Sequence, residues 1–265
     1  MRTPRLVTLY SGSDGNCTFV SSGSTHILID AGKSARTLCA KLTEIGSDIS
    51  EISAIFITHE HSDHISALET ISKKYHIPIH ITHGSAKKID RLPDATVHSC
   101  LVRHENIFCE TVGNITVKSF VTPHDSLMSV GYRIEFEMND NLRVFGVATD
   151  IGHVSESVRN GLLGCETVVL ESNHDEQMLL DGPYPRDLKM RILSKRGHLS
   201  NKDSALFAAE LAANGTKNII LAHLSRENND PSIAFDEVHG AISDDGVCIA
   251  VASPDCPTEI VLAEV

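Results

Sequence analysis

The sequence lacks the features of a disordered or membrane-spanning chain. Glycine and proline contribute only 17 and 9 of the 265 residues, no block of like charges stands out, and no stretch is of low complexity. A transmembrane helix would need a run of about eighteen apolar residues, and none is present. Because 41% of the residues are hydrophobic, a chain of this length can fill a core. We therefore expect one folded domain over residues 1–265 and no membrane partner.

Closely spaced cysteine pairs and a secretory leader are also missing. No two of the seven cysteines lie at the spacing of a zinc knuckle, and the N-terminal residues lack the apolar run of a signal peptide. We expect a cytoplasmic protein whose cysteines are reduced and mostly buried. These cysteines are Cys17, Cys39, Cys100, Cys109, Cys165, Cys248 and Cys256.

Positive charge is scarce as well. The formal net charge of -12 is unfavourable for a protein that approaches polyanions, because contacts to phosphates rely on lysine and arginine. Basic residues nevertheless gather in one segment, where Asp187 is the only acid among them. A solvated helix face and a patch that attracts phosphates explain this segment equally well. Its basic residues are Arg186, Lys189, Arg191, Lys195 and Arg196.

The apolar pattern is typical of a mixed α/β protein. Short runs rich in β-branched residues alternate with segments of helical period. The two halves of the chain share the order of meander, helix and strand with a polar end, so we expect each half to supply one sheet of a sandwich covered by helices. Strands are expected at 6–10, 18–21, 26–30, 54–58, 78–81, 116–121, 131–137, 143–148, 167–170 and 218–222, and helices at 34–45, from 62 onward and at 202–213.

One string stands out among the fifteen histidines. Residues 59–64, HEHSDH, follow an apolar run and precede a segment of helical period. Burying three imidazoles and a carboxylate without partners would be costly, and a metal that accepts nitrogen and oxygen ligands removes this cost. His59 and His61 can point to one side of an extended turn, while Asp63 and His64 can face a second ion from the first helical turn. We therefore expect a metal site here.

The string His59-Xaa-His61-Xaa-Asp63-His64 matches the HxHxDH signature of the metallo-β-lactamase superfamily. This resemblance implies an α/β fold, the four-layer αββα metallo-β-lactamase sandwich. In that family an aspartate at the end of an earlier strand accepts a hydrogen bond from a ligand imidazole and fixes its tautomer. Asp30 takes this place here, although as an isolated residue it would equally well cap a helix.

The resemblance also implies single ligands at the ends of later strands. His124, Asp150 and His223 each follow an apolar run and fit these positions. Asp150 would bridge two divalent ions, because only a carboxylate offers two oxygens that can hold both. One ion would then be held by His59, His61, His124 and Asp150, and the other by Asp63, His64, Asp150 and His223.

A site of this kind activates water. Two nearby cations lower the pKa of a shared water toward about 7 and supply hydroxide at neutral pH, and Asp63 would orient this nucleophile. Histidines and carboxylates without thiolates suit Zn, Mn or Fe.

The C-terminal third resembles ribonuclease Z at residues 223–226 (HLSR) and 197–200 (GHLS). In that enzyme a loop histidine after a strand protonates the leaving group, and His174 takes the corresponding place here. A hydrogen-bonded loop network with Glu171 and Asp175 explains His174 equally well. We expect His198 to be a structural residue before a helix that Ser200 or Asn201 caps.

Taken together, the motifs resemble the bacterial YycJ (WalJ) branch of the superfamily. That branch implies a 5′-to-3′ DNA exonuclease with nucleic acid as its substrate and a manganese preference. The β-CASP insertion that clamps nucleic acid in larger relatives is missing between Asp150 and His223. The Gly-rich loop 11–16 either contacts a phosphate or forms a plain hairpin turn. We expect substrate contacts from the residues that follow a ligand, Ser225, Arg226, Asn228 and Asn229.

Two other interpretations remain open. The same metal site would also hydrolyse a small phosphodiester, thioester or lactone, which the acidic charge favours. A non-catalytic binding module is the third interpretation, and the intact set of ligands argues against it.

Overall fold

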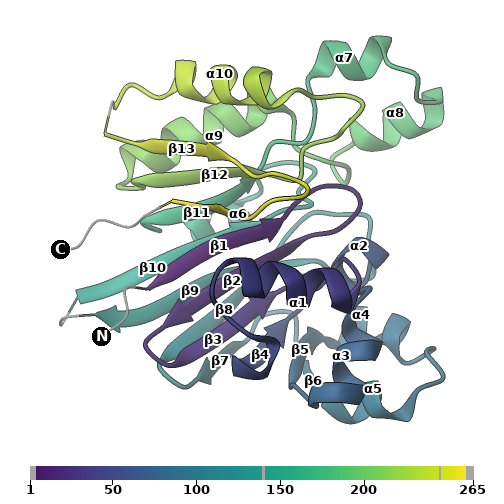
Figure 1. Ribbon diagram of the computed structural model, residues 1–265. Coiled ribbons are helices and arrows are strands. Elements are labelled where there is room, and N and C mark those ends of the chain that lie inside the picture. Colours follow the sequence, from purple (N-terminus) through teal and green to yellow (C-terminus); the bar gives the residue numbers. More distant parts are fainter. Residues whose placement is uncertain (1–3, 139–140, 245, 261–265) are drawn as a thin grey trace.

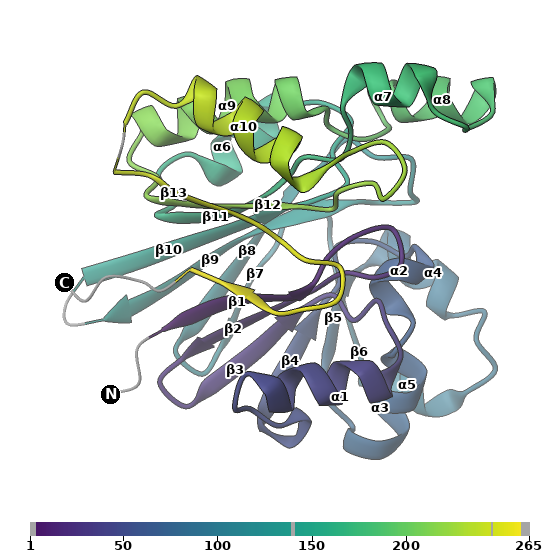
Figure 2. The ribbon, with the colours of Figure 1, turned by 45° about the horizontal axis from the view of Figure 1, so that its top comes forward.

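The computed structural model describes residues 4–138, 141–244 and 246–260. Two sheets pack face to face, and helices cover both outer faces, so the chain has four layers in the order αββα (Figure 2). This confirms the fold that the HxHxDH resemblance implied. None of the described helices is both long enough and apolar enough to span a bilayer.

The first sheet combines an antiparallel meander with parallel strands. Its strands β1 to β3 are antiparallel, and β4 to β6 continue the sheet in parallel. A short strand from the C-terminal end, β14, pairs with β1, so the expectation that each half supplies one whole sheet is correct except for this strand. The strands are β1 (Arg5–Tyr10), β2 (Cys17–Ser22), β3 (Thr25–Ile29), β4 (Ile52–Phe56), β5 (Ile79–Thr82), β6 (Leu101–His104) and β14 (Thr258–Glu259).

The second sheet repeats this plan. An antiparallel meander from β7 to β10 is followed by three parallel strands in the order β11, β12, β13. The edge strands β6 and β7 are consecutive in the chain, so the connection between the two sheets runs along one edge of the sandwich. The strands are β7 (Cys109–Val112), β8 (Ile115–Val121), β9 (Val130–Met138), β10 (Asn141–Ala148), β11 (Thr167–Glu171), β12 (Asn218–Ala222) and β13 (Cys248–Val251).

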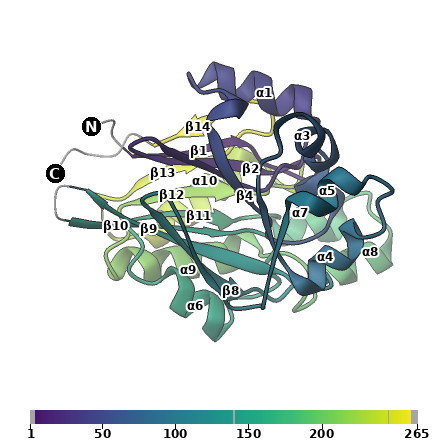
Figure 3. The same ribbon diagram turned by 90° about the horizontal axis from the view of Figure 1, so that it is seen from below.

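The helices divide between the two outer faces (Figures 1 and 3). On the first sheet lie α1 (Ala35–Glu44), α3 (Leu68–Tyr75) and α5 (Ala95–Cys100), and on the second lie α6 (Glu156–Leu162), α9 (Asn201–Ala213) and α10 (Pro231–Ala241). At the end of the sandwich where the site lies are α2 (Ser62–Ile65), α4 (His83–Ile89), α7 (Glu176–Asp181) and α8 (Arg186–Ile192), and η1 (Ile49–Glu51) precedes β4.

Apolar side chains fill the space between the two sheets. Phe56 from the first sheet packs edge-on against Tyr132 from the second, with ring centroids 5.8 Å apart, and Phe145 is buried in the same core. Tyr132 also donates a 2.6 Å hydrogen bond from its hydroxyl to the carbonyl of Ile57. This bond ties the two sheets together just before the HEHSDH segment, where the ligands begin.

The expected strands are confirmed, with ends that shift by one or two residues. The helix expected from Ser62 onward is divided into α2 and α3. The amide of Ala67 bonds to the carbonyl of Ala31 instead of to a carbonyl of the preceding helical turn, and this interrupts the helix. The expectation of mostly buried cysteines is wrong. All seven are free, but Cys109 and Cys248 lie exposed on edge strands and Cys256 in an exposed loop.

Candidate metal centre

The candidate ligands lie where strands of both sheets end. Asp30 directly follows β3, Asp150 lies two residues after β10, and His223 directly follows β12. These three residues have positive φ angles of 63°, 58° and 58°. A left-handed backbone is unfavourable for residues other than glycine and costs on the order of 1–3 kcal/mol when the surroundings enforce it. The fold therefore holds strained backbone at three polar residues of one site.

Three imidazoles form a first group. One ligand atom from each of His59, His61 and His124 lies within 4.8 Å of the others. The Nε2 atom of His124 is 3.4 Å from Nδ1 of His61. This group matches three of the four ligands expected for one ion.

A second group contains Asp63, His64 and His223, whose ligand atoms also lie within 4.8 Å of one another. Oδ2 of Asp63 is 3.3 Å from Nε2 of His64 and 3.7 Å from Nε2 of His223. This group matches three of the ligands expected for the other ion.

Asp150 lies between these two groups. Its Oδ2 atom is 3.3 Å from Nε2 of His64, and its Oδ1 atom is 3.7 Å from Nε2 of His124 and 3.5 Å from Nδ1 of His223. The structure therefore brings together all seven predicted ligands, which come from four separate segments of the chain. Asp150 has the central position that its predicted bridging role requires.

The chemistry of these side chains fits bound cations. The Nε2 atoms of His59 and His223 and Oδ2 of Asp150 are buried without a hydrogen-bond partner among the described residues. Burial opposes a charge on His64, but the carboxylates of Asp30, Asp150 and Asp63 raise its pKa well above the ordinary value. A bound divalent cation would account for both observations, because it accepts the lone pairs of the unpartnered atoms and neutralises the charge of the carboxylates.

Asp30 holds one of these imidazoles in place. Its Oδ2 atom is 2.8 Å from Nδ1 of His64, so it directs Nε2 of that ring into the cluster. Oδ1 accepts the amide hydrogen of Thr58, and burial raises the pKa of Asp30. The alternative role as a helix cap has no support in this geometry, because Ser34 caps α1.

The Gly-rich loop 11–16 is part of the wall of the site. The side-chain nitrogen of Asn16 lies 3.4 Å from Oδ2 of Asp63 and 3.3 Å from Nε2 of His64, and the hydroxyl of Ser11 accepts the amide hydrogen of His223. Gly32 packs so closely between this loop and the HEHSDH segment that a Cβ atom there would lie 2.6 Å from the amide nitrogen of Asn16 and 1.5 Å from the carbonyl oxygen of Asp63. The loop is therefore more than a plain hairpin turn, and its contact with a phosphate stays a prediction.

Glu171 and His198 belong to the cluster, and sequence reasoning missed this. Oε1 of Glu171 is 2.9 Å from Nδ1 of His223 and 2.8 Å from Nδ1 of His198. Burial alone would raise the pKa of Glu171, but the two imidazoles outweigh burial and lower it to about 2. Glu171 ends β11, so the signal that found Asp150 and His223, a polar residue at a strand end, also applied to it.

His198 has a different place from the one expected. Ser200 does cap α9, but the ring of His198 faces the site, with Nδ1 3.8 Å from Oδ1 of Asp150. Its side chain is 20% exposed, whereas that of Glu171 is fully buried. His198 therefore lies at the open side of the cluster, where a substrate can reach it.

His174 lies deeper in the protein. Its carbonyl accepts the amide hydrogen of Asn201, and the residue is 1% exposed. Both ring nitrogens lack a hydrogen-bond partner among the described residues. Burial, with a smaller contribution from His198, lowers the pKa of His174 to about 4. Its predicted role as a proton donor stays a prediction.

The segment that follows His223 holds the loop together. Asn228 and Asn229 are buried, and the side-chain Nδ2 atom of Asn229 donates to the carbonyl of Ser172. Ser225 accepts hydrogen bonds from the backbone and side chain of Asn228. Arg226 is exposed and pairs with Asp14. Substrate contacts from these four residues stay a prediction, and Arg226 is the one whose side chain is accessible.

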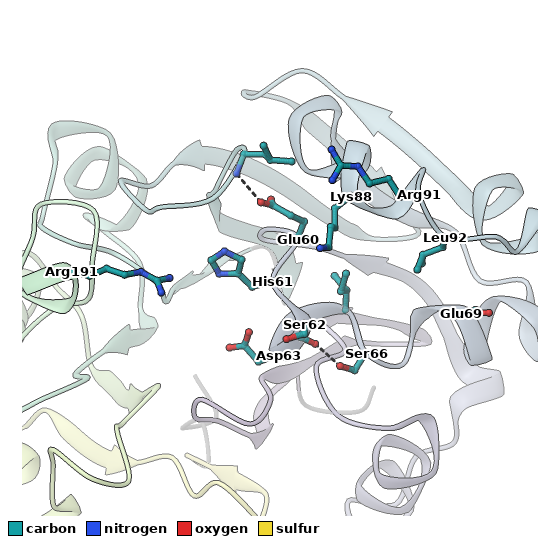
Figure 4. A pocket seen from close by; sticks show the side chains of 12 residues that line it. Glu60, His61, Ser62, Asp63, Ser66, Glu69, Lys88, Arg91, Leu92 and Arg191 are labelled. Carbon is teal, nitrogen blue, oxygen red and sulfur yellow. Dashed lines mark hydrogen bonds between the residues drawn. The ribbon is translucent and has the colours of Figure 1, made fainter. Parts of the chain in front are cut away.

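A cavity of about 710 Å³ opens beside the cluster and is lined by His61 and Asp63 (Figure 4). Lys88 and Arg91 lie on one side of this cavity and Arg191 on the other. Glu60 also lines it, but its carboxylate accepts hydrogen bonds from the backbone of residue 127 and from a serine hydroxyl of α4. The cavity therefore joins the metal cluster to three basic side chains.

The basic segment at 186–196 has mixed roles. Arg191 lines the cavity and pairs with Asp125, while Arg196 donates to the carbonyl of His124 and so supports a ligand. Lys189 donates to the carbonyl of Leu180. The segment is thus a polar helix face in part, and one of its arginines reaches the cavity, while the attraction of phosphates stays a prediction.

Two helix-covered sheets with histidines and aspartates gathered at their strand ends define the class of metal-dependent hydrolases with the metallo-β-lactamase fold. Residues 25–224 match the family described as the beta-lactamase superfamily domain. The chain belongs to this superfamily.

Relatives of known name align with most of the chain. Exodeoxyribonuclease YycJ of Bacillus anthracis is 34% identical over 262 residues, which are 95% of this chain and 96% of the relative. Exodeoxyribonuclease WalJ of Streptococcus pneumoniae serotype 2 (strain D39) is 34% identical over 228 residues, 85% of this chain and 83% of the relative.

Solved structures share the fold at lower identity. The metallo-beta-lactamase fold protein YhfI from Bacillus subtilis has a TM-score of 0.73 at 17% identity, covering 97% of this chain and 100% of its own. The short form of human tRNase Z has a TM-score of 0.63 at 19% identity, with the same coverage of 97% and 100%.

Replacing Asp30 tests how the cluster is held. We expect Asp30→Asn to weaken metal binding by about 10–100-fold, because the amide orients His64 without supplying the negative charge. Competition with a coloured chelator measures the affinity. The control is Asp236→Asn on the exposed face of α10. Equal affinities in wild type and Asp30→Asn would contradict the role of Asp30.

Replacing His174 tests the effect of its burial on acid stability. Its pKa lies near 4 in the folded chain and near 6.5 in the unfolded one, so between these values only the unfolded chain binds the proton and acid favours unfolding. We expect the free energy of unfolding of metal-free wild type to fall between pH 7 and pH 5. In metal-free His174→Gln this fall should be about 2 kcal/mol smaller. Urea unfolding measures this difference. The same fall in both proteins, or an equal change in the control His239→Gln, would refute it.

Proposed function

We propose that the chain is a metal-dependent exodeoxyribonuclease that removes nucleotides from the 5′ end of DNA. The observation that carries the proposal is the cavity beside the cluster, where a strongly acidic protein presents Lys88, Arg91 and Arg191. The names of the relatives at 34% identity support the same substrate class. The alignment with YycJ extends over 95% of the chain, so this support concerns the chain as a whole.

The residues of the cluster suit a pair of divalent ions, and we propose Zn, Mn or Fe. His59, His61 and His124 would hold one ion, Asp63, His64 and His223 the other, and Asp150 both. When bound, two such cations activate water and neutralise charge on the attacked phosphate.

Asp63 would orient the attacking water. Its side chain is 20% exposed and lines the cavity, so it is the carboxylate of the cluster that a substrate phosphate approaches. Burial opposes ionisation, but His64 and His223 lower the pKa of Asp63 well below its usual range. The group is therefore ionised and accepts a hydrogen bond from water.

His198 is the side chain best placed to protonate the leaving oxygen. Glu171 accepts a hydrogen bond from its Nδ1 atom and fixes the ring, which leaves Nε2 for the substrate. His174, by contrast, is almost fully buried. A phosphodiester releases an alkoxide, so a proton donor at this position accelerates the reaction.

The basic side chains of the cavity would hold the DNA backbone. Among the described residues, the side chains of Lys88 and Arg91 form no ion pair, so their charge is available to phosphates. Leu92 and Leu127 line the same cavity and offer apolar surface to a base. The missing insertion that clamps nucleic acid in larger relatives makes this cavity the main contact surface.

Comparing two histidine variants tests the proton donor. We expect His198→Gln to lower kcat on DNA by about 10²–10⁴-fold with unchanged metal content, because the variant loses the donor and keeps the ligands. His174→Gln should retain a kcat close to that of wild type. Single-turnover cleavage and elemental analysis measure the two quantities. The reverse ranking of the variants would restore His174 as the donor.

Removing the free cations of the cavity tests the substrate. We expect Lys88→Ala and Arg91→Ala each to lower kcat/KM on an oligonucleotide. Each should also reduce by about 1 the steepness with which log kcat/KM falls against the logarithm of the salt concentration. Hydrolysis of bis(p-nitrophenyl) phosphate should not change. The matched control is Lys87→Ala, which alters the exposed neighbour that does not line the cavity.

The same assay with end-blocked oligonucleotides decides the polarity. A blocked 5′ end should stop degradation and a blocked 3′ end should not. Degradation from the 3′ end would refute the polarity, and cleavage of the small ester alone would replace DNA by a small phosphodiester as the substrate.

A further inference from the structure

A second cluster of metal-ligand residues lies at the edge where the chain crosses between the sheets. His80 on β5, His104 at the end of β6 and Glu110 on β7 each offer a ligand atom, and these atoms lie within 4.8 Å of one another. The cluster shares no residue with the catalytic cluster. Its two histidines come from the first sheet and its glutamate from the second.

The cluster faces the space between the sheets. His80 stacks on Phe56, with centroids 4.4 Å apart and planes at 18°, and Phe56 belongs to the core between the sheets. On β7, Val112 packs against the same core, and Glu110, two residues earlier, points to the same face of the strand. The polar cluster thus closes the apolar core at this edge.

The two imidazoles are held ready for a common ligand. Nδ1 of His80 and Nε2 of His104 are 2.9 Å apart, and Phe108 stacks on His104 at 4.0 Å with the planes 11° apart. Two nitrogens bound to one tetrahedral zinc ion lie about 3.3 Å apart, so a small movement makes room for an ion. Burial lowers the pKa of His80 to about 4 and also lowers that of His104, which keeps both rings in the neutral form that binds metals.

We propose that His80, His104 and Glu110 form a structural site for a divalent cation such as Zn²⁺ that joins the edges of the two sheets. Two imidazoles and one carboxylate are a donor set that zinc accepts. On binding, the proton now shared by the two rings moves to the other nitrogen of the donor ring, so both facing nitrogens bind the ion and no proton is lost. The carboxylate of Glu110 neutralises one of the two positive charges.

Counting ions per chain tests this proposal. The whole protein, stripped with a chelator and equilibrated with Zn²⁺, is measured by native mass spectrometry. We expect wild type to hold one ion more than His104→Gln and Glu110→Gln, which alter half-buried residues and leave the buried His80 in place. The controls His239→Gln on α10 and Glu137→Gln on β9 should match wild type. Equal counts in all five proteins, or a lost ion in a control, would overturn the proposal.

A second measurement separates this site from the catalytic one. In the double variant His59→Ala/His61→Ala, Zn²⁺ should still raise Tm, and adding His104→Gln should make that rise smaller, because Asp63, His64 and His223 of the catalytic cluster are still present. If Tm rises equally with and without His104, no ion joins the two sheets. Neither measurement depends on DNA cleavage, so the outcomes of both are independent of the proposed exonuclease activity.

Discussion

The contacts of Asp150 with the imidazoles around it are the interaction on which the site depends. Asp150 follows a strand of the second sheet, and its two oxygens face His64 from the first sheet and His124 and His223 from the second. Buried charges of this kind are tolerated only with partners or a metal. The sandwich is therefore closed at this end by electrostatic attraction, whereas Tyr132 and its apolar neighbours hold the interior.

The fold could be predicted because its central strands and two of its three longest helices, α1 and α9, have recognisable patterns, whereas α10 was not expected. Strands β8 and β9 alternate apolar with polar residues, β11 and β12 are short apolar runs, and α9 has an apolar face. The short edge strands β6, β7, β13 and β14 could not be found, since two to four residues are too few to show a period. The break between α2 and α3 was also hidden, because a distant backbone carbonyl at Ala31 causes it.

The candidate ligands could be located from two signals, a dense motif and single polar residues at strand ends. The partners that orient them gave weaker signals. Glu171 was considered only as part of one alternative for His174, and Asn16 only within a loop that either contacts a phosphate or forms a turn. Their contacts with ligands were missed because these contacts join residues far apart in the chain. The polarity of Asn228 and Asn229 and their position after His223 suggested substrate contacts. The structure shows both residues buried, with Asn229 bonded to Ser172, and their contact with a substrate stays a prediction.

The left-handed backbone at Asp30, Asp150 and His223 has a consequence for how such proteins diverge. Asparagine, aspartate and glycine tolerate this conformation better than other residues do. A copy of the gene released from selection for activity would therefore be free to lose the buried charge at these positions, but glycine or asparagine would be the replacements that the backbone tolerates. Descendants without chemistry would carry the trace of the lost site as small or amide residues at the ends of the same strands.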